Sequence, residues 1–167
     1  STAGYYLLSA RNITNEGIKL DDVDFVEEEE YLRIRKRCNP EVGDVLISCS
    51  GSVGRVAVAD SNEYVMVRSA ALIKQSREHL NATYLANALK APFAQLQIIQ
   101  KSKTTAQSNL FLGKILEISI PLPSLSEQNR IVAKTNQLMA LCDTLDQHIA
   151  ASIAKQTELL NTVMAQV

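Results

Sequence analysis

The stretch 121–134 constrains the fold of this chain more than any other part of the sequence. Two prolines, Pro121 and Pro123, stop a preceding strand from continuing and set the direction in which the next element enters. Ser124 and Glu127 then have the S-x-x-E spacing of a capping box, in which each side chain satisfies a free backbone N–H at a helix start. The stretch therefore predicts the boundary between a compact body and a long helix.

Residues 124–167 contain no glycine or proline, and a seam from Ile131 to Gln166 advances in alternating steps of four and three. Most seam positions are apolar, and four are polar: Thr135, Ser152, Gln156 and Gln166. This heptad pattern is typical of a coiled coil, and polar residues within such a seam fix its register. An amphipathic helix that folds back on its own domain as two pieces is the alternative. The predicted helix interface consists of Ile131, Leu138, Cys142, Leu145, Ile149, Leu159 and Val163.

The preceding body, residues 1–123, predicts an α+β fold rich in short strands. β-Branched runs indicate strands, and Gly51-Ser52 between two of them indicates a hairpin turn. Asn81 is a good N-cap for a helix. The expected strands are 6–10, 45–50, 53–59, 64–67, 70–73 and 115–120, and the expected helices are 27–37, 82–90 and 93–100.

Composition excludes several classes of protein. The 167 residues suffice for one domain with an appendage, and no apolar run is long enough to span a bilayer. The N-terminus does not resemble a signal peptide. Three cysteines and two histidines, widely spaced, match neither a disulfide framework nor a metal motif. We expect a cytoplasmic protein without a metal.

The net charge of −1 does not by itself indicate nucleic-acid binding, but the charges are unevenly distributed. Eight acids and one lysine lie within 16–30, whereas 79–116 contains no acid and four lysines. Such segregation can place a cationic face on a neutral protein. Ordinary solvated faces are the alternative explanation.

The segment 48–55, Ser-Cys-Ser-Gly-Ser-Val-Gly-Arg, suggests several kinds of site. It lacks the first glycine of a nucleophile elbow and the Gly-Lys of a phosphate-binding loop. Its G-x-x-G resembles that of KH domains, but predicted strands flank it here, where that motif joins helices. A hairpin tip of Ser and Gly beside Arg55 can approach a phosphate backbone closely.

The polar segment 101–109 is the best candidate for contacts with bases, because lysines supply charge while hydroxyls and amides offer donors and acceptors. An exposed polar loop is the alternative. The predicted DNA-binding residues are Lys101, Lys103, Thr104, Thr105, Gln107, Asn109, Ser50, Ser52, Arg55, Arg11 and Arg68. No catalytic set of Ser, His, Cys and Asp can be assembled, so we expect a non-catalytic chain.

Several segments, in order, resemble the DNA-specificity subunits of type I restriction–modification systems. The match extends over almost the whole chain. It includes Leu-Ser-Ala-Arg-Asn-Ile at 8–13, Gly-Asp-Val-Leu-Ile-Ser at 43–48, Ser-Gly-Ser-Val-Gly at 50–54, and the junction from Pro-Leu-Pro to Arg-Ile-Val at 121–132.

This resemblance implies a non-enzymatic subunit that reads DNA and directs methylation and cleavage by partners. Those partners are a methyltransferase subunit, which binds S-adenosylmethionine, and a nuclease that translocates along DNA; this chain itself needs no cofactor. In the family, two recognition domains are each followed by a long helix, and the two helices pack antiparallel. Residues 1–123 then correspond to one target-recognition domain and 124–167 to a spacer helix.

The chain departs from the family pattern because it has one recognition domain and lacks the opening strand. We therefore expect an N-terminally truncated fragment or a half-subunit that forms an antiparallel homodimer through its helix. An assembly module that only dimerises and docks a partner is the alternative function. A hydrolase that uses Ser50 or Ser52 is a third possibility, but no base partner is apparent.

Overall fold

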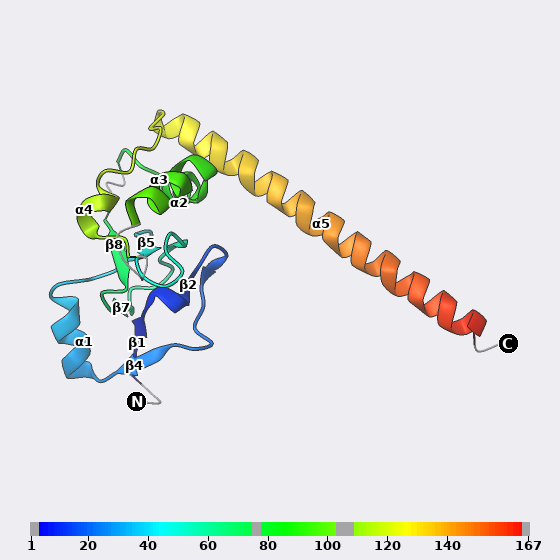
Figure 1. Cartoon of the computed structure of the whole chain (residues 1–167), viewed down its shortest axis with the longest axis horizontal. Coiled ribbons are helices and arrows are strands. Elements are labelled where there is room, and N and C mark those ends of the chain that lie inside the picture. Colours follow the sequence, from blue (N-terminus) through cyan, green and yellow to red (C-terminus); the bar gives the residue numbers. More distant parts are fainter. Residues whose placement is uncertain (1–3, 75–77, 103–108, 165–167) are drawn as a thin grey trace. The chain divides into compact units, whose positions relative to one another are not determined.

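The computed structural model describes residues 4–74, 78–102 and 109–164, and it confirms an α+β fold with a long C-terminal helix (Figure 1). The chain divides into two compact units, Ser1–Gln128 and Asn129–Val167. The first unit contains every described strand and the shorter helices, and the second consists of most of the long helix. The functional assignment of residues 1–123 and 124–167 stays a prediction.

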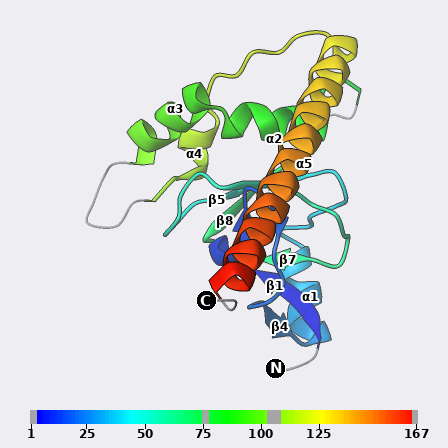
Figure 2. The same cartoon turned by 90° about the vertical axis from the view of Figure 1, so that its right-hand side faces the viewer.

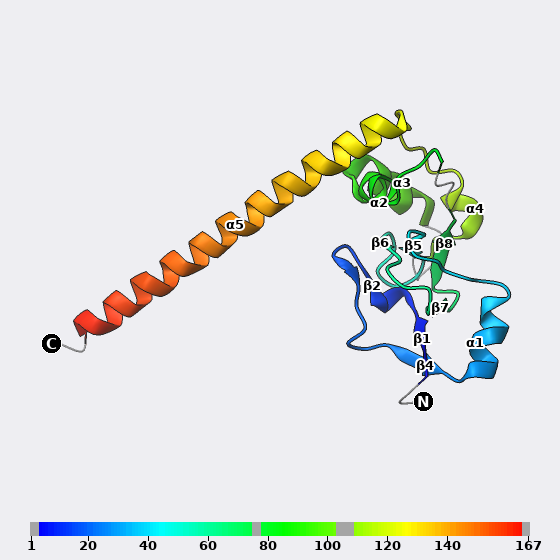
Figure 3. The same cartoon turned by 180° about the vertical axis from the view of Figure 1, so that it is seen from behind.

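Three small sheets form the body. One has the order β4-β1-β7, with β1 antiparallel to β4 and parallel to β7. The second is the hairpin β2-β3, and the third has the antiparallel order β6-β5-β8 (Figure 3). The strands are β1 (Tyr5–Leu8), β2 (Ile13–Thr14), β3 (Gly17–Ile18), β4 (Asp24–Val26), β5 (Val45–Ser48), β6 (Val56–Val58), β7 (Val65–Met66) and β8 (Ala70–Ile73).

The helices follow the predicted order in outline. The short 3-10 helix η1 spans Ala10–Asn12, and the α-helices are α1 (Glu28–Arg35), α2 (Ala82–Lys90), α3 (Pro92–Ser102), α4 (Leu112–Ile115) and α5 (Leu125–Met164). As predicted, Asn81 caps α2, because its side chain accepts a hydrogen bond of 3.0 Å from the Tyr84 N–H. Helices α2 and α3 lie over the sheet that contains β5 and β8 (Figure 2).

The central strand β5 separates two cores because alternate residues of a strand point to opposite faces. Val45 and Ile47 pack with Leu85 and Leu89 of α2, whereas Leu46 packs in a second cluster with Leu8 and Met66. All four residues of β5 are buried. Both faces of this sheet are therefore covered.

A third cluster fixes α1 against the first sheet. Tyr31 and Ile34 of α1 pack on Val65 of β7, and the rings of Tyr5 and Tyr31 stack with their centroids 3.8 Å apart. On the exposed side of α1, Arg33 forms an ion pair with Glu30, three residues earlier on the helix. Two more basic residues, Lys36 and Arg37, follow directly after the last residue of α1, Arg35.

The strand predicted at 115–120 is wrong. Residues 112–115 form α4, and Ser119 satisfies its backbone through a side chain: its N–H donates to Gln97 Oε1 at 2.9 Å, and its carbonyl accepts from Gln97 Nε2 at 3.0 Å. An amide side chain of α3 thus replaces a neighbouring strand. The apolar residues Ile115, Ile118 and Ile120 still pack on the core, and Ile118 and Ile120 keep the two-residue spacing of a strand.

The start of α5 is anchored by a buried amide. Gln128 is completely buried, and its side chain donates to the carbonyls of His79 at 3.0 Å and Pro123 at 2.9 Å and accepts from the Asn81 N–H at 2.9 Å. The predicted cap is present in part, since the Glu127 N–H donates to Ser124 Oγ at 3.4 Å. The first turn of α5 is therefore tied to the N-terminus of α2 within the first unit.

Candidate nucleic-acid interface

One cavity of about 400 Å³ gathers residues from three distant parts of the sequence. Four of the eight residues that line it are serines and two are arginines, so we name it the serine-rich cavity. It contains four predicted DNA-binding residues, Arg11, Ser50, Ser52 and Arg55, and its full lining is Ser9, Ala10, Arg11, Ser50, Gly51, Ser52, Arg55 and Ser69.

The hairpin tip that supplies half of this cavity is rigidly held. The buried Ser48 hydroxyl accepts a 2.9 Å hydrogen bond from the Arg55 N–H and donates to the Ser52 carbonyl. Gly54 has φ +90°, and a Cβ there would lie 2.9 Å from Oε1 of Gln95. Gln95 also donates to the Gly54 carbonyl. The tip thus presents Ser52 and Arg55 from a fixed backbone.

The hairpin tip also meets the end of the polar segment 101–109. Ser50 and Asn109 form an antiparallel β-bridge, and the next N–H, of Leu110, donates to the Cys49 carbonyl at 2.8 Å. The Cys49 N–H donates to the Ser69 carbonyl at 2.7 Å on the other side. Asn109 and the hairpin tip, which the sequence predicts separately as DNA contacts, therefore lie side by side. Lys103, Thr104, Thr105 and Gln107 lie outside the described residues.

The two arginines of the serine-rich cavity have different electrostatic surroundings. Arg11 pairs with Asp22 at 3.3 Å and Asp24 at 2.8 Å, so its charge is partly compensated. Arg55 is exposed, and within the described parts of the chain no carboxylate forms an ion pair with it. Arg55 is therefore the stronger candidate for binding an anion.

Lys101 is not a free cation. Its ammonium lies 3.0 Å from the carboxylate of Glu117, which also binds Lys114 at 2.8 Å. Hydrogen bonds from Lys114 and Lys101 hold the pKa of the Glu117 carboxyl below its ordinary value. The segment 79–116, which contains no acid, is followed directly by Glu117. In the fold, Glu117 pairs with Lys101 and Lys114, two of the four lysines of that segment. Lys101 can reach a phosphate only by leaving this pair.

The remaining predicted residue, Arg68, lies in a neighbouring cavity with Arg37 and several apolar residues. Sequence reasoning missed Ser9 and Ser69, which line the serine-rich cavity. Ser69 also accepts a 3.0 Å hydrogen bond from the Ala10 N–H, which joins η1 to the start of β8. The local sequence around Ser9 and Ser69 does not predict that they line one cavity, because pairing between β1 and β7 brings them together.

The lining of the serine-rich cavity supports binding more than catalysis. It includes no His, Asp or Glu, so Ser50 and Ser52 have no general base among the residues that line it. The buried Cys49 thiol is unreactive because burial raises its pKa to about 11.

Among the described residues, no cluster of His, Cys, Asp and Glu could hold a metal, and no helix is apolar and long enough to cross a bilayer.

The long helix α5 exposes an apolar stripe over most of its 40 residues. The predicted interface residues Leu138, Cys142, Leu145 and Ile149 are all exposed, while the side chains of Leu159 and Val163 lie outside the described part. Other exposed apolar residues of α5 do not fit the heptad, among them Met139, Leu141, Ile153, Leu160 and Met164. Of these, Ile153, Leu160 and Met164 belong to an 11-residue repeat, whose 3.67 residues per turn keep a stripe nearly straight along a helix. Its members are Ile131, Cys142, Ile153 and Met164, with Leu138, Ile149 and Leu160.

Comparisons with known proteins agree on one family. Residues 4–155 match the model of the type I restriction modification DNA specificity domain. The chain is 26% identical over 164 residues to the type I restriction enzyme EcoBI specificity subunit of Escherichia coli, covering 98% of this chain and 34% of that protein.

Solved structures share the fold. The HsdS subunit of Thermoanaerobacter tengcongensis superposes with a TM-score of 0.72 at 22% identity, covering 93% of this chain and 40% of that one. A chain from a structural study of assembly and conformational transition of the type I R-M system gives a TM-score of 0.65 at 26% identity, covering 93% of this chain and 36% of that one. The chain thus spans little more than a third of the relatives that it matches.

Proposed function

Since this chain belongs to the family of type I restriction modification DNA specificity domains, we propose that it recognises one half of a split sequence in double-stranded DNA. In this proposal residues 1–123 are the target-recognition domain, and residues 124–167 are the spacer helix. The chain itself performs no catalysis. It directs a methyltransferase subunit, which carries S-adenosylmethionine, and a nuclease subunit to the site, in the cytoplasm where these systems act.

The main support for this proposal is that polar and basic side chains from three separate parts of the sequence line the serine-rich cavity. Hydroxyls and guanidinium groups from η1, the hairpin tip and the start of β8 face one cavity, beside the end of the polar segment 101–109. Hydroxyls can donate to or accept from base edges and phosphates, and arginine binds guanine or phosphate with two parallel hydrogen bonds. A rigid scaffold holds these groups, as discrimination between bases requires.

The apolar stripe of α5 supports a second part of the proposal. A helix of 40 residues is about 60 Å long, and its exposed leucines and isoleucines gain free energy when a second helix covers them. We propose that two copies of this chain pair antiparallel through α5 and so present two recognition domains to the DNA.

Replacing Arg55 by glutamine tests the recognition role. Loss of a guanidinium that contacts a base costs about 1–3 kcal/mol and relaxes specificity at that position. We therefore expect the preference for cognate over random DNA to fall about 10- to 100-fold in the complex with the methyltransferase subunit. Competition binding with labelled duplexes measures it.

The matched control is Arg33→Gln, which removes an exposed guanidinium that pairs with Glu30 on α1. This variant should keep the wild-type preference within twofold. If Arg55→Gln keeps the wild-type preference for cognate DNA, Arg55 does not take part in recognition. If the wild-type complex itself shows no preference between DNA sequences, the assembly module is favoured.

A further inference from the structure

Ion pairs occupy six of the described cations: Arg11, Lys19, Arg33, Lys74, Lys101 and Lys114. By contrast, Arg37 and Arg68 are exposed, and neither forms an ion pair with a carboxylate in the part of the chain that the structure describes. They come from the end of α1 and from the turn before β8, yet they line the same cavity.

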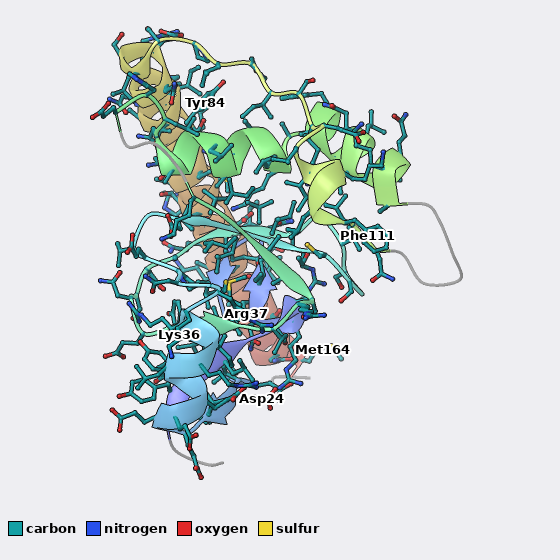
Figure 4. All side chains as sticks on the ribbon, turned by 90° about the vertical axis from the view of Figure 1, so that its left-hand side faces the viewer. Asp24, Lys36, Arg37, Tyr84, Phe111 and Met164 are labelled. Atoms are coloured by element: carbon teal, nitrogen blue, oxygen red, sulfur yellow. The ribbon has the colours of Figure 1, made fainter. Side chains whose placement is uncertain are left out.

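This second cavity, of about 560 Å³, combines the two arginines with an apolar floor and an apolar lip, and we name it the arginine–apolar cavity. Its floor contains Met66 and Leu110, which are 2% and 3% exposed. At the lip lie two neighbouring apolar residues, Phe111 and Leu112, which are 63% and 67% exposed. Figure 4 shows the molecule from the side on which Arg37 and Phe111 are seen.

The floor carries no negative charge that could neutralise the arginines. Its two thiols stay protonated at neutral pH because burial raises the pKa of Cys49 to about 11 and also raises that of Cys38. The lining includes no Asp or Glu and no Asn, Gln, Ser or Thr. A ligand that fits this cavity is therefore anionic opposite the arginines and apolar elsewhere, and apart from the two arginines the lining offers no charged, amide or hydroxyl side chain for contacts with base edges.

The arginine–apolar cavity adjoins the serine-rich cavity through the backbone. Ser69 of the serine-rich cavity lies between Arg68 and Ala70 of the other, and the Cys49 N–H binds the Ser69 carbonyl at 2.7 Å. Leu110, on the floor, directly follows Asn109 of the β-bridge. The two cavities are therefore lined by residues that are direct neighbours along the chain, Ser69 beside Arg68 and Asn109 beside Leu110.

We propose that Arg37 and Arg68 bind phosphates of one DNA strand, with the apolar faces of the deoxyriboses resting on Phe111 and Leu112. This inference rests on the proposed function and assigns phosphate binding to the arginine–apolar cavity and base recognition to the serine-rich cavity. Guanidinium groups form strong, paired hydrogen bonds with phosphate, and such contacts fix the register of a protein on the duplex without reading its sequence. Recognition is then left to the serine-rich cavity.

The double variant Arg37→Gln/Arg68→Gln tests the proposal in the complex with the methyltransferase subunit. Affinity for cognate and for random-sequence duplexes should fall by the same factor, about 10- to 100-fold at low salt. The slope of log affinity against log salt concentration should become shallower by about 2, because two fewer counterions are released. The preference for cognate DNA should stay within twofold of wild type.

The matched control is Lys36→Gln, which removes one exposed charge next to Arg37 but outside the cavity lining. Its slope should change by less than half of the change in the double variant. An unchanged slope in Arg37→Gln/Arg68→Gln, with wild-type DNA preference intact, would overturn the phosphate assignment and leave the proposed function standing. Loss of preference with an unchanged slope would overturn it too, since the arginines would then read bases. A wild-type complex without any DNA preference would instead contradict the proposed function.

Discussion

Replacement of Gln128 by alanine is expected to lower the free energy of unfolding by about 2–4 kcal/mol, because each buried polar group left without a partner costs about 1–3 kcal/mol. The change removes three part-buried hydrogen bonds of a completely buried side chain and takes their partner from the Asn81 N–H and from the carbonyls of His79 and Pro123. Urea denaturation followed by circular dichroism measures the loss.

Two variants sharpen this test. Gln137→Ala, on the exposed surface of α5, should change the unfolding free energy by less than about 0.5 kcal/mol. Gln128→Glu keeps the shape but turns a carboxylate oxygen toward two carbonyls, which raises the pKa of the new carboxyl in the folded state. A raised folded-state pKa means that this variant regains stability as pH falls through that value. A Gln128→Ala protein as stable as wild type would show that the anchor contributes little.

Charges placed in the apolar stripe of α5 should abolish self-association. Leu145→Glu/Ile149→Glu removes two apolar contacts worth about 1.5–3 kcal/mol each when buried, so the dimer should weaken at least 100-fold. Sedimentation equilibrium at micromolar concentration should give a dimer for wild type and a monomer for the variant. A monomeric wild-type chain would contradict pairing through α5.

The same experiment distinguishes the two possible registers of the stripe. The heptad leaves Ile153 outside the seam, whereas the 11-residue repeat places it at the centre. Ile153→Glu should therefore weaken the dimer as strongly as Ile149→Glu if the 11-residue repeat holds, and far less if the heptad holds. Asp146→Asn, also on α5, serves as the surface control.

The sequence predicts those parts of the fold that depend on local signals. The α2 helix, capped by Asn81, and the β5–β6 hairpin around Gly51 are confirmed, because capping and turn chemistry act within a few residues. The predicted strand at 115–120 is wrong because Gln97, on a different element, satisfies the Ser119 backbone. Periodicity alone could not distinguish a strand from an extended segment that packs its isoleucines on the same core.

The candidate site could be predicted only in part for a similar reason. The sequence identifies four hydroxyl and guanidinium side chains as candidate DNA contacts, and the fold places all four in one cavity: Arg11, Ser50, Ser52 and Arg55. The ion pair between Lys101 and Glu117 could not be foreseen, since it joins residues 16 positions apart through the packing of α3 and α4. The role of Gln128 could not be predicted either, because a glutamine in a polar helical turn gives no sign that it will be fully buried.

The central claim is that this chain chooses the DNA sequence on which its partner acts, and methylation mapping tests it most directly. The chain is mixed with a cognate methyltransferase subunit, S-adenosylmethionine and random-sequence DNA, and the methylated sites are sequenced. Our account predicts one defined motif, palindromic because two copies pair through α5. It also predicts that Arg55→Gln makes that motif degenerate at one position in each half. Methylation without a motif, or a stable complex that methylates nothing, would contradict the account and favour an assembly module.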